Sequence, residues 1–295
     1  MGKQEPNIFL LGSTGQLGYQ LHSKLTKLGK VLIPDRKKFS FEVPELLRKE
    51  LKNYKPDIIV NAAAYTAVDK AESEHEKAFK VNTEAPKILA EEAERRNIPL
   101  VHFSTDYVFD GTKSFPYTEK DSTDPVNVYG LSKLLGEQEI QRVSEKFLII
   151  RTSWVYSQIG NNFLNTMLKL LNTKNEVRVV DDQEGSPTCT SNIADLTVTF
   201  LEKMFLNNIE PNWGLYNLTA AGRTTWYDFA KKIKLMASIK RRVKIIPVST
   251  EDYATQAKRP KMSLLDNSKI NKELGIKQMS WEYWLKREIN NNEYH

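Results

Sequence analysis

The sequence predicts an α/β protein built on a doubly wound parallel sheet, and three observations favour this fold class. Short apolar runs alternate with stretches of helical periodicity through residues 1–150. The runs are continuous rather than interrupted by polar residues, which is typical of strands buried on both faces. A glycine-rich turn at 12–18 joins the first run to the first helical stretch. Together these features predict parallel strands connected by helices.

Each element of this first half has its own signal. The expected strands are the apolar runs 7–11, 30–34, 57–61, 100–104 and 147–151. Leucines recur at helical spacing after the glycine turn, so the first helix is expected to end at Gly29. The other expected helices are 44–54, 74–97 with an interruption near Pro86, and 127–144.

Beyond Arg151 the alternation becomes less regular. The expected helices are 162–171, 192–207, 226–238 and 281–290, with short strands at 177–180 and 215–218. Prolines break this half into small pieces. We therefore expect two domains: residues 1–155, which also receive part of 190–218, and a smaller α/β domain formed mainly by 156–295.

Composition and charge exclude several classes of protein. The 295 residues include 43 basic and 37 acidic side chains, a net charge of +6. The basic clusters 36–38 and 240–242 are short and lie among acidic residues, so no nucleic-acid partner is expected. No apolar run approaches the roughly 20 residues that cross a bilayer, and residues 1–11 show no secretion signal. With Cys189 as the single cysteine, internal disulfides and multi-cysteine zinc sites are excluded, and we expect a cytoplasmic protein.

The glycine turn has the spacing of a dinucleotide-binding loop. Gly12, Gly15 and Gly18 form G-x-x-G-x-x-G between a strand and a helix, where small residues let the backbone approach a pyrophosphate. Asp35 lies 17 residues beyond Gly18 (35 − 18), and a carboxylate there can accept a hydrogen bond from an adenosine ribose. A tight structural turn is the alternative for the glycines alone. In this context they predict a Rossmann-type dinucleotide-binding domain in residues 1–155.

A tyrosine and a lysine form the second motif. Tyr129 and Lys133 are four residues apart on one face of a predicted helix. A phenol, with a reference pKa near 10, becomes a useful acid–base group when a cation stabilises its anion. Thr105 follows the fourth strand, at the edge where open α/β sheets bind ligands. The three side chains suit protonation of a carbonyl oxygen during hydride transfer, although Tyr129 and Lys133 alone could be an exposed surface pair.

Seven blocks resemble the dTDP-4-dehydrorhamnose reductase family of extended short-chain dehydrogenases/reductases. They are NAAAYTAVDKAE (61–72), STDYVFDG (104–111), NVYGLSKLLGE (127–137), RTSWVY (151–156), NNFLNTMLKL (161–170), QEGSPT (183–188) and RPKMSLLD (259–266). The blocks occur in the order of the family. The resemblance implies reduction of the C4 ketone of dTDP-4-dehydro-L-rhamnose to dTDP-L-rhamnose, a sugar donor for bacterial surface polysaccharides. The cofactor it implies is NADPH, often with NADH as a substitute.

The resemblance also implies roles for single residues. The implied catalytic set is Thr105, Tyr129 and Lys133. Besides the three glycines, Tyr129 and Lys133, the residues implied to line the cofactor are Gln16, Leu17, Asp35, Ala63, Ala64 and Tyr65. The residues implied to face the sugar nucleotide are Thr66, Val68, Thr105, Asp106, Tyr107 and Trp154. For Val68 and Trp154 the alternative is packing in the core.

Two features depart from the family pattern. Ser40 and Phe41 stand where many relatives have an acidic residue near the adenine side of the cofactor. Gln20 and Ser191 stand where some members have carboxylates that hold a metal between subunits. We therefore expect no metal and assign no oligomeric state.

Two other functions remain open. A sugar-nucleotide dehydratase of this superfamily needs an Asp–Glu pair after the catalytic threonine, whereas here Asp106 is followed by Tyr107; a 4-epimerase is the related alternative. A non-catalytic NADP-binding regulatory subunit, similar to the methionine adenosyltransferase β subunit, shares comparable blocks. An intact catalytic set does not exclude that subunit.

The residues after the second strand predict modest discrimination between the two nicotinamide cofactors. Asp35 favours the free ribose hydroxyl of NADH, whereas Arg36 and Lys37 can pair with the 2′-phosphate of NADPH. We expect NADPH to be preferred and NADH to be tolerated. Steady-state kinetics with each cofactor should give kcat/KM values within about a hundredfold, which corresponds to roughly 2.7 kcal/mol. A larger ratio would show that one of the two signals dominates.

Overall fold

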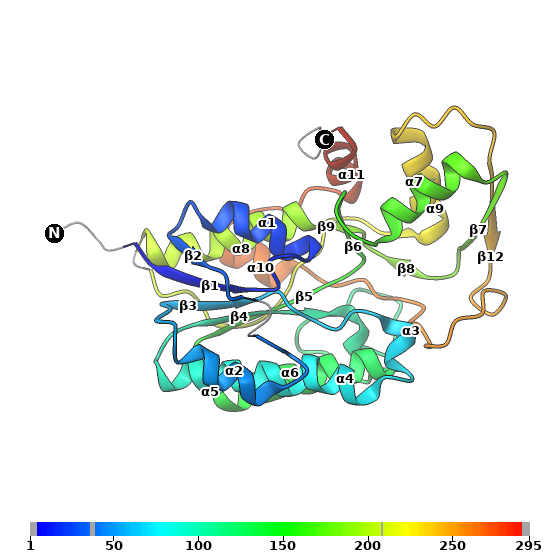
Figure 1. Ribbon diagram of the computed structural model, residues 1–295. Coiled ribbons are helices and arrows are strands. Elements are labelled where there is room, and N and C mark those ends of the chain that lie inside the picture. The colour runs from blue at the N-terminus through cyan, green and yellow to red at the C-terminus, as the bar shows by residue number, and fades with distance from the viewer. Residues whose placement is uncertain (1–4, 36–38, 208, 291–295) are drawn as a thin grey trace.

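A six-stranded parallel sheet forms the centre of the protein (Figure 1). The computed structural model describes residues 5–35, 39–207 and 209–290. In spatial order the strands are β10 (Gly214–Asn217), β5 (Phe147–Thr152), β4 (Leu100–Thr105), β3 (Ile58–Asn61), β1 (Asn7–Leu11) and β2 (Lys30–Leu32). Each neighbouring pair in this sheet is parallel, so the carboxyl ends of the strands lie along one edge. The predicted α/β fold class is confirmed.

The order of the strands reverses beside β1. From β1 the chain goes to β2 on one side, and it then returns to β3, β4 and β5 on the other side. Such a reversal leaves a crevice outside the carboxyl ends of the strands, where open α/β sheets bind their ligands. The glycine turn follows β1 and Ala63 follows β3, so both border this crevice.

Helices cover both faces of the sheet (Figure 1). On one face are α1 (Gln16–Leu25), α8 (Thr190–Phe205) and α10 (Ser268–Leu274). On the other face are α2 (Pro44–Leu51), α5 (Ala85–Arg95) and α6 (Val128–Val143). Successive strand residues point to opposite faces, so Ile8 and Leu10 pack under α1 and α8, whereas Phe9 and Leu11 pack under α2 and α5. Two apolar cores therefore hold one continuous sheet.

A smaller lobe, here called the cap, projects beyond the carboxyl edge of the sheet (Figure 1). Its helices are α7 (Phe163–Thr173), α9 (Trp226–Met236) and α11 (Trp281–Asn290). Its strands β7 (Glu176–Val180) and β12 (Lys244–Val248) pair in parallel. The short strands β6 (Val155–Tyr156), β8 (Glu184–Gly185), β9 (Thr188–Cys189) and β11 (Thr224–Thr225) lie between the cap and the sheet. A separate apolar core, which includes Phe229 and Trp281, stabilises the cap.

The prediction of a helical stretch over 74–97 with an interruption near Pro86 is confirmed, and the interruption lies just before that proline. The structure has α4 (His75–Phe79), a π-helical turn η1 (Lys80–Glu84) and then α5. Pro86 does not break the helix because it occupies the first turn of α5, where a missing N–H costs little.

The side chain of Asn82 accounts for the π turn. Its Oδ1 accepts a hydrogen bond from Tyr65 N (2.9 Å), and its Nδ2 donates to Ser132 Oγ (3.0 Å). A Cβ on Gly136 would lie 2.1 Å from the carbonyl oxygen of Asn82, so α6 and η1 are in direct backbone contact. The turn thus joins the segment after β3 to the helix that carries Tyr129 and Lys133. Such π turns are frequent at functional sites.

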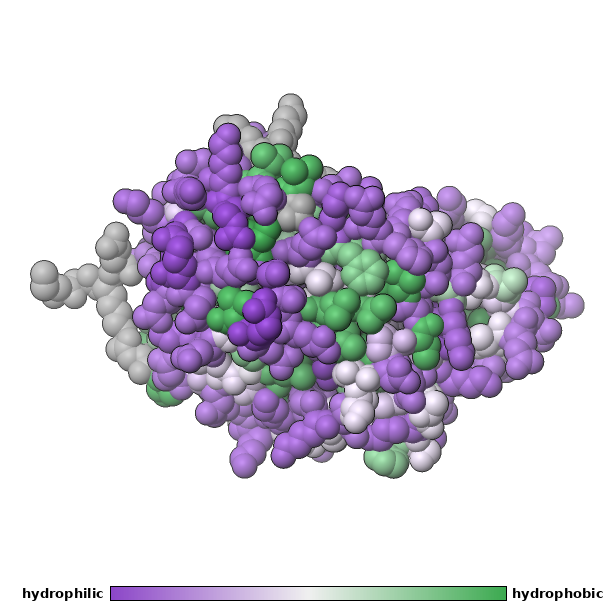
Figure 2. All heavy atoms as spheres, turned by 90° about the horizontal axis from the view of Figure 1, so that it is seen from below, coloured by the Kyte–Doolittle hydropathy of each residue, from purple (hydrophilic) through white to green (hydrophobic). Residues whose placement is uncertain are grey.

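The surface over α2, α5 and α6 is largely hydrophilic, with a group of hydrophobic side chains near its centre (Figure 2). On α2, Leu46 contributes an exposed hydrophobic side chain. Within the ranges that the structure describes, no helix combines the length and apolar character needed to cross a bilayer.

Candidate active site

The glycine turn is too tight for side chains at two of its three glycines. Gly12 has φ +76°, and a Cβ there would lie 2.5 Å from Ala63 N. A Cβ on Gly18 would lie 2.0 Å from the carbonyl oxygen of Gly12. Gly15 donates its N–H to that same oxygen (3.0 Å) and precedes the first residue of α1, Gln16. Among the described residues, no side chain makes a cap hydrogen bond at the N-terminus of α1, so its first N–H groups can bind the pyrophosphate of a dinucleotide.

The other predicted cofactor residues lie around this turn. Gln16 and Leu17 open α1 and are half-buried. Ala63, Ala64 and Tyr65 follow β3, and the hydroxyl of Tyr65 donates to Glu74 Oε2 (3.2 Å). Asp35 is exposed beyond the end of β2. Arg36 and Lys37 lie outside the described residues.

Thr105 and Tyr129 meet at the carboxyl end of β4. Thr105 is the last residue of β4 and is 5% exposed. Its hydroxyl accepts a hydrogen bond from Tyr107 N (3.2 Å) and donates to Asp106 Oδ1 (3.0 Å). Burial raises the pKa of Tyr129 to about 12, while a hydrogen bond with Thr105 acts in the opposite direction. Tyr129 is therefore a phenol at neutral pH, the form that can donate a proton.

Lys133 is buried one helical turn after Tyr129. Its side chain is 1% exposed, and Nζ donates to the carbonyl oxygen of Phe103 (2.7 Å). The same Nζ lies 3.1 Å from His102 Nε2. Burial lowers the pKa of Lys133 to about 8, and the carboxylate of Glu137 opposes this shift. Lys133 can thus lose its proton near neutral pH, which an exposed lysine does not do.

The residues predicted to face the substrate lie on three segments, of which the first two are the end of β4 with η2 and the start of α3. Asp106 and Tyr107 start the short 3-10 turn η2 (Asp106–Val108), and the rings of Tyr107 and Tyr129 meet edge to face with centroids 5.8 Å apart. Asp106 is 2% exposed, and within the described chain its Oδ2 has no hydrogen-bond partner. Thr66 is exposed and Val68 is half-buried at the start of α3 (Val68–Ala71).

The ring of Trp154 is packed against neighbouring residues, whereas a ring that stacks on a ligand usually has one face free. Its ring stacks on Trp226 with centroids 3.6 Å apart and an interplanar angle of 6°. A Cβ on Gly185 would lie 2.3 Å from its Cε2, and its Nε1 donates to Ser263 Oγ (3.2 Å). Its φ of +47° is unusual for a bulky side chain and indicates local backbone strain. These contacts are those of a packed aromatic ring, and the role of Trp154 in substrate binding stays a prediction.

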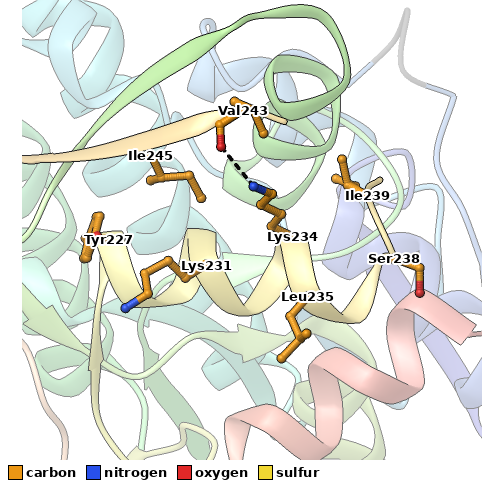
Figure 3. Close-up of a pocket in the computed structure, with 8 residues that line it drawn as sticks. All are labelled: Tyr227, Lys231, Lys234, Leu235, Ser238, Ile239, Val243 and Ile245. Carbon is orange, nitrogen blue, oxygen red and sulfur yellow. Dashed lines mark hydrogen bonds between the residues drawn. The ribbon is translucent and has the colours of Figure 1, made fainter. Parts of the chain in front are cut away.

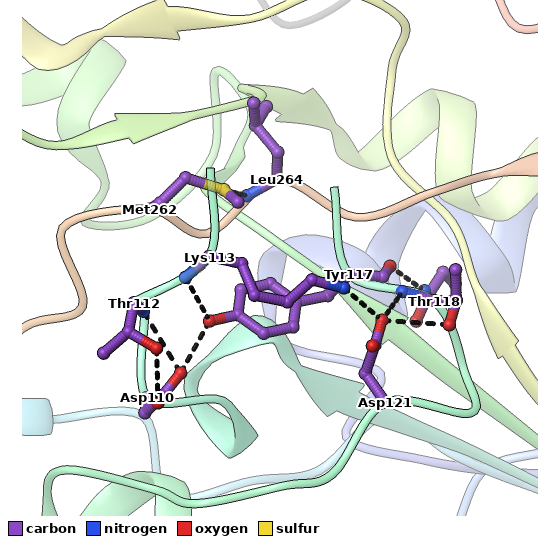
Figure 4. A network of polar contacts seen from close by, with 9 residues as sticks. Asp110, Thr112, Lys113, Tyr117, Thr118, Asp121, Met262 and Leu264 are labelled. Atoms are coloured by element: carbon purple, nitrogen blue, oxygen red, sulfur yellow. Dashed lines mark hydrogen bonds and ion pairs between the residues drawn. The ribbon is translucent and has the colours of Figure 1, made fainter. Parts of the chain in front are cut away.

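A carboxy-terminal segment closes one side of the site. Arg259 forms two hydrogen bonds with the carboxylate of Asp69 (2.7 and 3.1 Å). Further along, Tyr117 N donates to the carbonyl oxygen of Leu264 (2.8 Å), and Tyr117 OH donates to Asp110 Oδ1 (2.6 Å) (Figure 4). The segment 257–265 is therefore fixed at both of its ends.

Sequence reasoning missed several residues that build the site. Asn127 Oδ1 caps α6 by accepting from Gly130 N (2.7 Å), and its Nδ2 donates to the carbonyl oxygen of Lys258 (2.8 Å). Asparagine is a preferred N-cap residue, so its position directly before a predicted helix could have revealed this cap. His102 lies in the middle of a strand, where only its position on the side facing α6 distinguishes it from a core residue.

A hollow of about 440 Å³ lies elsewhere, between α9 and β12 of the cap (Figure 3). Lys234 crosses it and donates to the carbonyl oxygen of Val243 (2.9 Å). None of the predicted site residues lines this hollow.

The structure offers no preformed metal site where it is described. In that part of the chain, no group of three or more histidine, cysteine or acidic side chains is arranged to hold a metal ion. Ser191 Oγ lies 3.0 Å from Cys189 Sγ. Gln20 is 6% exposed on α1. The expectation of no metal stays a prediction.

A Rossmann-type sheet with a threonine, a tyrosine and a lysine at its carboxyl edge defines a short-chain dehydrogenase/reductase. The family described as RmlD substrate binding domain matches residues 6–293. The chain is 41% identical to a dTDP-4-dehydrorhamnose reductase of Burkholderia thailandensis, over 94% of this chain and 95% of that protein. It belongs to the dTDP-4-dehydrorhamnose reductase family.

Solved structures of the same family agree closely in fold. A dTDP-4-dehydrorhamnose reductase from Clostridium acetobutylicum is 36% identical, with a TM-score of 0.89 over 96% of this chain and 98% of the other. An enzyme of that name from Bacillus anthracis, solved in complex with NADP, is 34% identical, with a TM-score of 0.88 over 97% and 99%.

The buried carboxyl group of Asp106 predicts an unusual pH dependence of stability. Burial raises its pKa to about 7, although hydrogen bonds from the hydroxyls of Ser263 and Thr105 act in the opposite direction. Because the folded protein then holds a proton that the unfolded chain loses above about pH 4, Asp106 lowers stability as the pH rises from 4 to 7. Asp106→Asn should therefore increase the free energy of unfolding at pH 8 by about 2–4 kcal/mol. The gain should shrink towards pH 4 in urea unfolding experiments.

Asp110 provides the matched control for Asp106. Hydrogen bonds from Tyr117 and Thr112 lower its pKa, so its carboxylate stabilises the fold above about pH 4. Asp110→Asn should lose stability at neutral pH and approach the wild type in acid. If Asp106→Asn follows that same pattern, Asp106 is not a buried, protonated acid.

Proposed function

We propose that the protein reduces the C4 ketone of dTDP-4-dehydro-L-rhamnose to dTDP-L-rhamnose with NADPH, as part of deoxysugar nucleotide synthesis for surface polysaccharide. The observation that carries this proposal is that Thr105, Tyr129 and Lys133 lie together at the end of β4, on the same carboxyl edge of the sheet as the glycine turn. Membership of a family named for this reaction supports it. The NADP bound to the Bacillus anthracis relative supports the cofactor.

The residues around the glycine turn fit the cofactor. The absence of side chains at Gly12 and Gly18 lets the turn pack tightly against the start of α1 and the segment after β3, and the first N–H groups of α1 are available as donors. When bound, NADPH supplies the hydride. Lys133 would hold the nicotinamide ribose, and Ala63 would lie beside the cofactor.

The residues of the chain perform the acid chemistry. Tyr129, a phenol because of its raised pKa, donates its proton to the ketone oxygen. Thr105 hydrogen-bonds the same oxygen and so orients it. Lys133, in its cationic form, stabilises the phenolate that Tyr129 becomes. A positioned general acid of this kind contributes about 10²–10⁴-fold to the rate.

We extend the proposal to the two lobes. Residues 1–155, with strand β10 from the region 190–218, would form the cofactor-binding domain, and 156–295 would mainly form the cap of the substrate site. On the side of the first domain, contacts with the substrate would come from Thr66, Val68, Thr105, Asp106, Tyr107 and Trp154. The substrate is then held between the sheet edge and the cap, where Gln16 Oε1 already accepts a hydrogen bond from Asn162 Nδ2 (3.3 Å).

The two alternative functions, a dehydratase and a regulatory subunit, differ from the proposed reductase in one site residue or in turnover. A dehydratase would need a second acid beside Asp106, but that position is Tyr107. A regulatory subunit would bind NADPH without turnover. Incubating the purified protein with NADPH and the dTDP-4-keto sugar, and following absorbance at 340 nm, separates a reductase from both alternatives.

Removing the Tyr129 hydroxyl should abolish turnover while leaving cofactor binding nearly intact. In Tyr129→Phe the ring still fills its space and Lys133 is unchanged, so the loss should fall on kcat by about 10²–10⁴-fold. Lys133→Met should instead weaken NADPH binding as well as rate, because it removes a cation and a cofactor contact. Steady-state kinetics and calorimetric NADPH titration measure both effects. A Tyr129→Phe variant with more than about a tenth of the wild-type kcat, when chemistry limits the rate, would exclude Tyr129 as the acid.

Replacing Trp154 tests which role its ring has. We expect Trp154→Ala to weaken sugar-nucleotide binding more than NADPH binding, because an aromatic face packs well against a deoxysugar ring. Trp226→Ala is the matched control, since it removes the same ring stack from the cap side. Calorimetry with each ligand and thermal unfolding give the comparison. Equal losses for both ligands, with a large fall in Tm, would assign Trp154 to packing.

A further inference from the structure

His102 links the catalytic lysine to the segment that would border the cofactor. The register of the sheet places Asn61 of β3 directly beside His102 of β4. Asn61 Nδ2 lies 3.1 Å from His102 Nδ1, and His102 Nε2 lies 3.1 Å from Lys133 Nζ. At the other end, Ala63 N donates to Asn61 Oδ1 (3.1 Å). His102 and Asn61 are each 1% exposed, so water does not compete for these contacts.

The backbone N–H of Ala63 can act only as a donor, and this fixes the direction of the hydrogen bonds along Ala63, Asn61 and His102. The backbone N–H of Ala63 requires an acceptor, which fixes Oδ1 of Asn61 towards it. Nδ2 of Asn61 then donates to Nδ1 of His102. Because a neutral imidazole carries a single proton, that proton is on Nε2 and points at Lys133. An ammonium at Lys133 has no lone pair to accept it, whereas a neutral amine does.

The surroundings of His102 keep its ring neutral. Burial, with the charge of Lys133, lowers the pKa of His102 well below its ordinary value. Other ionisable groups on the packed elements include Tyr129 and Glu137 of α6, Asp106 of η2, Arg151 of β5 and Glu72, which accepts from the N-terminus of α6. Glu139 and Arg142, also on α6, pair with each other (2.6 Å). Glu137 favours the ammonium of Lys133, but its carboxylate is paired with Arg151 by three contacts of 2.6–3.2 Å.

We propose that His102 is a positioning residue that sets the protonation state of Lys133, by donating its Nε2 proton to the amine form of that side chain. The relay Ala63–Asn61–His102 holds the ring in the tautomer that makes this donation possible. This inference rests on the proposed function, because Lys133 is there the partner of Tyr129.

The relay gives Lys133 a second task in the reduction. Transfer of the phenolic proton to the ketone oxygen leaves a phenolate on Tyr129. In this step the Lys133 ammonium gives a proton back to the phenolate and becomes a neutral amine, and the amine then takes up a proton from solvent. Each turnover thus consumes one solvent proton, and the proton transfers move no electrons. His102 stabilises that amine by the hydrogen bond it donates, and this makes the ammonium a better proton donor.

The direct test is the titration of Lys133 in the protein without cofactor. In protein labelled with ¹³C-lysine, the ¹³Cε resonance that disappears in Lys133→Met belongs to Lys133. We expect a midpoint near pH 8 in the wild type, in keeping with the lowered pKa of Lys133. In His102→Gln the amide can turn its oxygen to the ammonium, so the midpoint should rise by about one pH unit, a tenfold change in the ratio of the two forms.

A second variant and a control complete the experiment. Asn61→Ser removes the donor that fixes the tautomer, so the midpoint should rise in this variant too. Ser144→Ala, at the far end of α6 from Lys133, should titrate as the wild type does. In turnover, the alkaline limb of the kcat–pH profile should move with the NMR midpoint.

Two results would overturn the proposal. One is an unchanged midpoint in both folded variants, His102→Gln and Asn61→Ser. The other is a fall in kcat with no movement of the pH profile, which would show that His102 has only a packing role. If the wild-type protein reduces no dTDP-4-keto sugar, the proposed function fails, and the NMR titration still decides the role of His102.

Discussion

Helix α6 buries two charged side chains against the sheet, and the rest of the site depends on how those charges are compensated. Lys133 and Glu137 are 1% and 0% exposed. An uncompensated buried charge costs several kcal/mol. Arg151 of β5 pairs with Glu137, and Lys133 donates to the backbone of β4. Because these partners lie on two adjacent strands, α6 has one position in which both charges are satisfied, and that position brings Tyr129 to Thr105.

The sequence predicted the first half of the fold well because its strands are short, continuous apolar runs. Strands β1, β3, β4 and β5 lie within one residue of the predicted bounds. The cap was harder because its strand β12 carries a proline and pairs with β7 across more than sixty residues, a pairing that no local pattern reveals. The form of the interruption in the 74–97 helix, a π turn, could not be predicted for a similar reason, since the amide contacts of Asn82 are tertiary.

The residues of the candidate site likewise fall into those that a local sequence pattern reveals and those that only tertiary contacts reveal. The spacing of the glycines and the Tyr129–Lys133 interval are local patterns whose residue types indicate a chemical role, so these groups could be found from the sequence. Asn61 and His102 are ordinary strand residues until the register places them side by side. The stack of Trp154 on Trp226 likewise joins two segments distant in the sequence. Contacts between distant segments are the part that composition and periodicity do not encode.

The contacts of segment 257–265 with residues much earlier in the chain set the stage of synthesis at which the substrate site can form. Arg259 pairs with Asp69, which is 190 residues earlier in the chain, and β10 joins the sheet only after β5 is complete. A nascent chain that has emerged as far as residue 210 holds Tyr129, Lys133 and the glycine turn but lacks both. Contacts across such separations form late, because loop closure precedes them. The chain must therefore be synthesised beyond these segments, to about residue 265, before the two lobes can enclose a substrate.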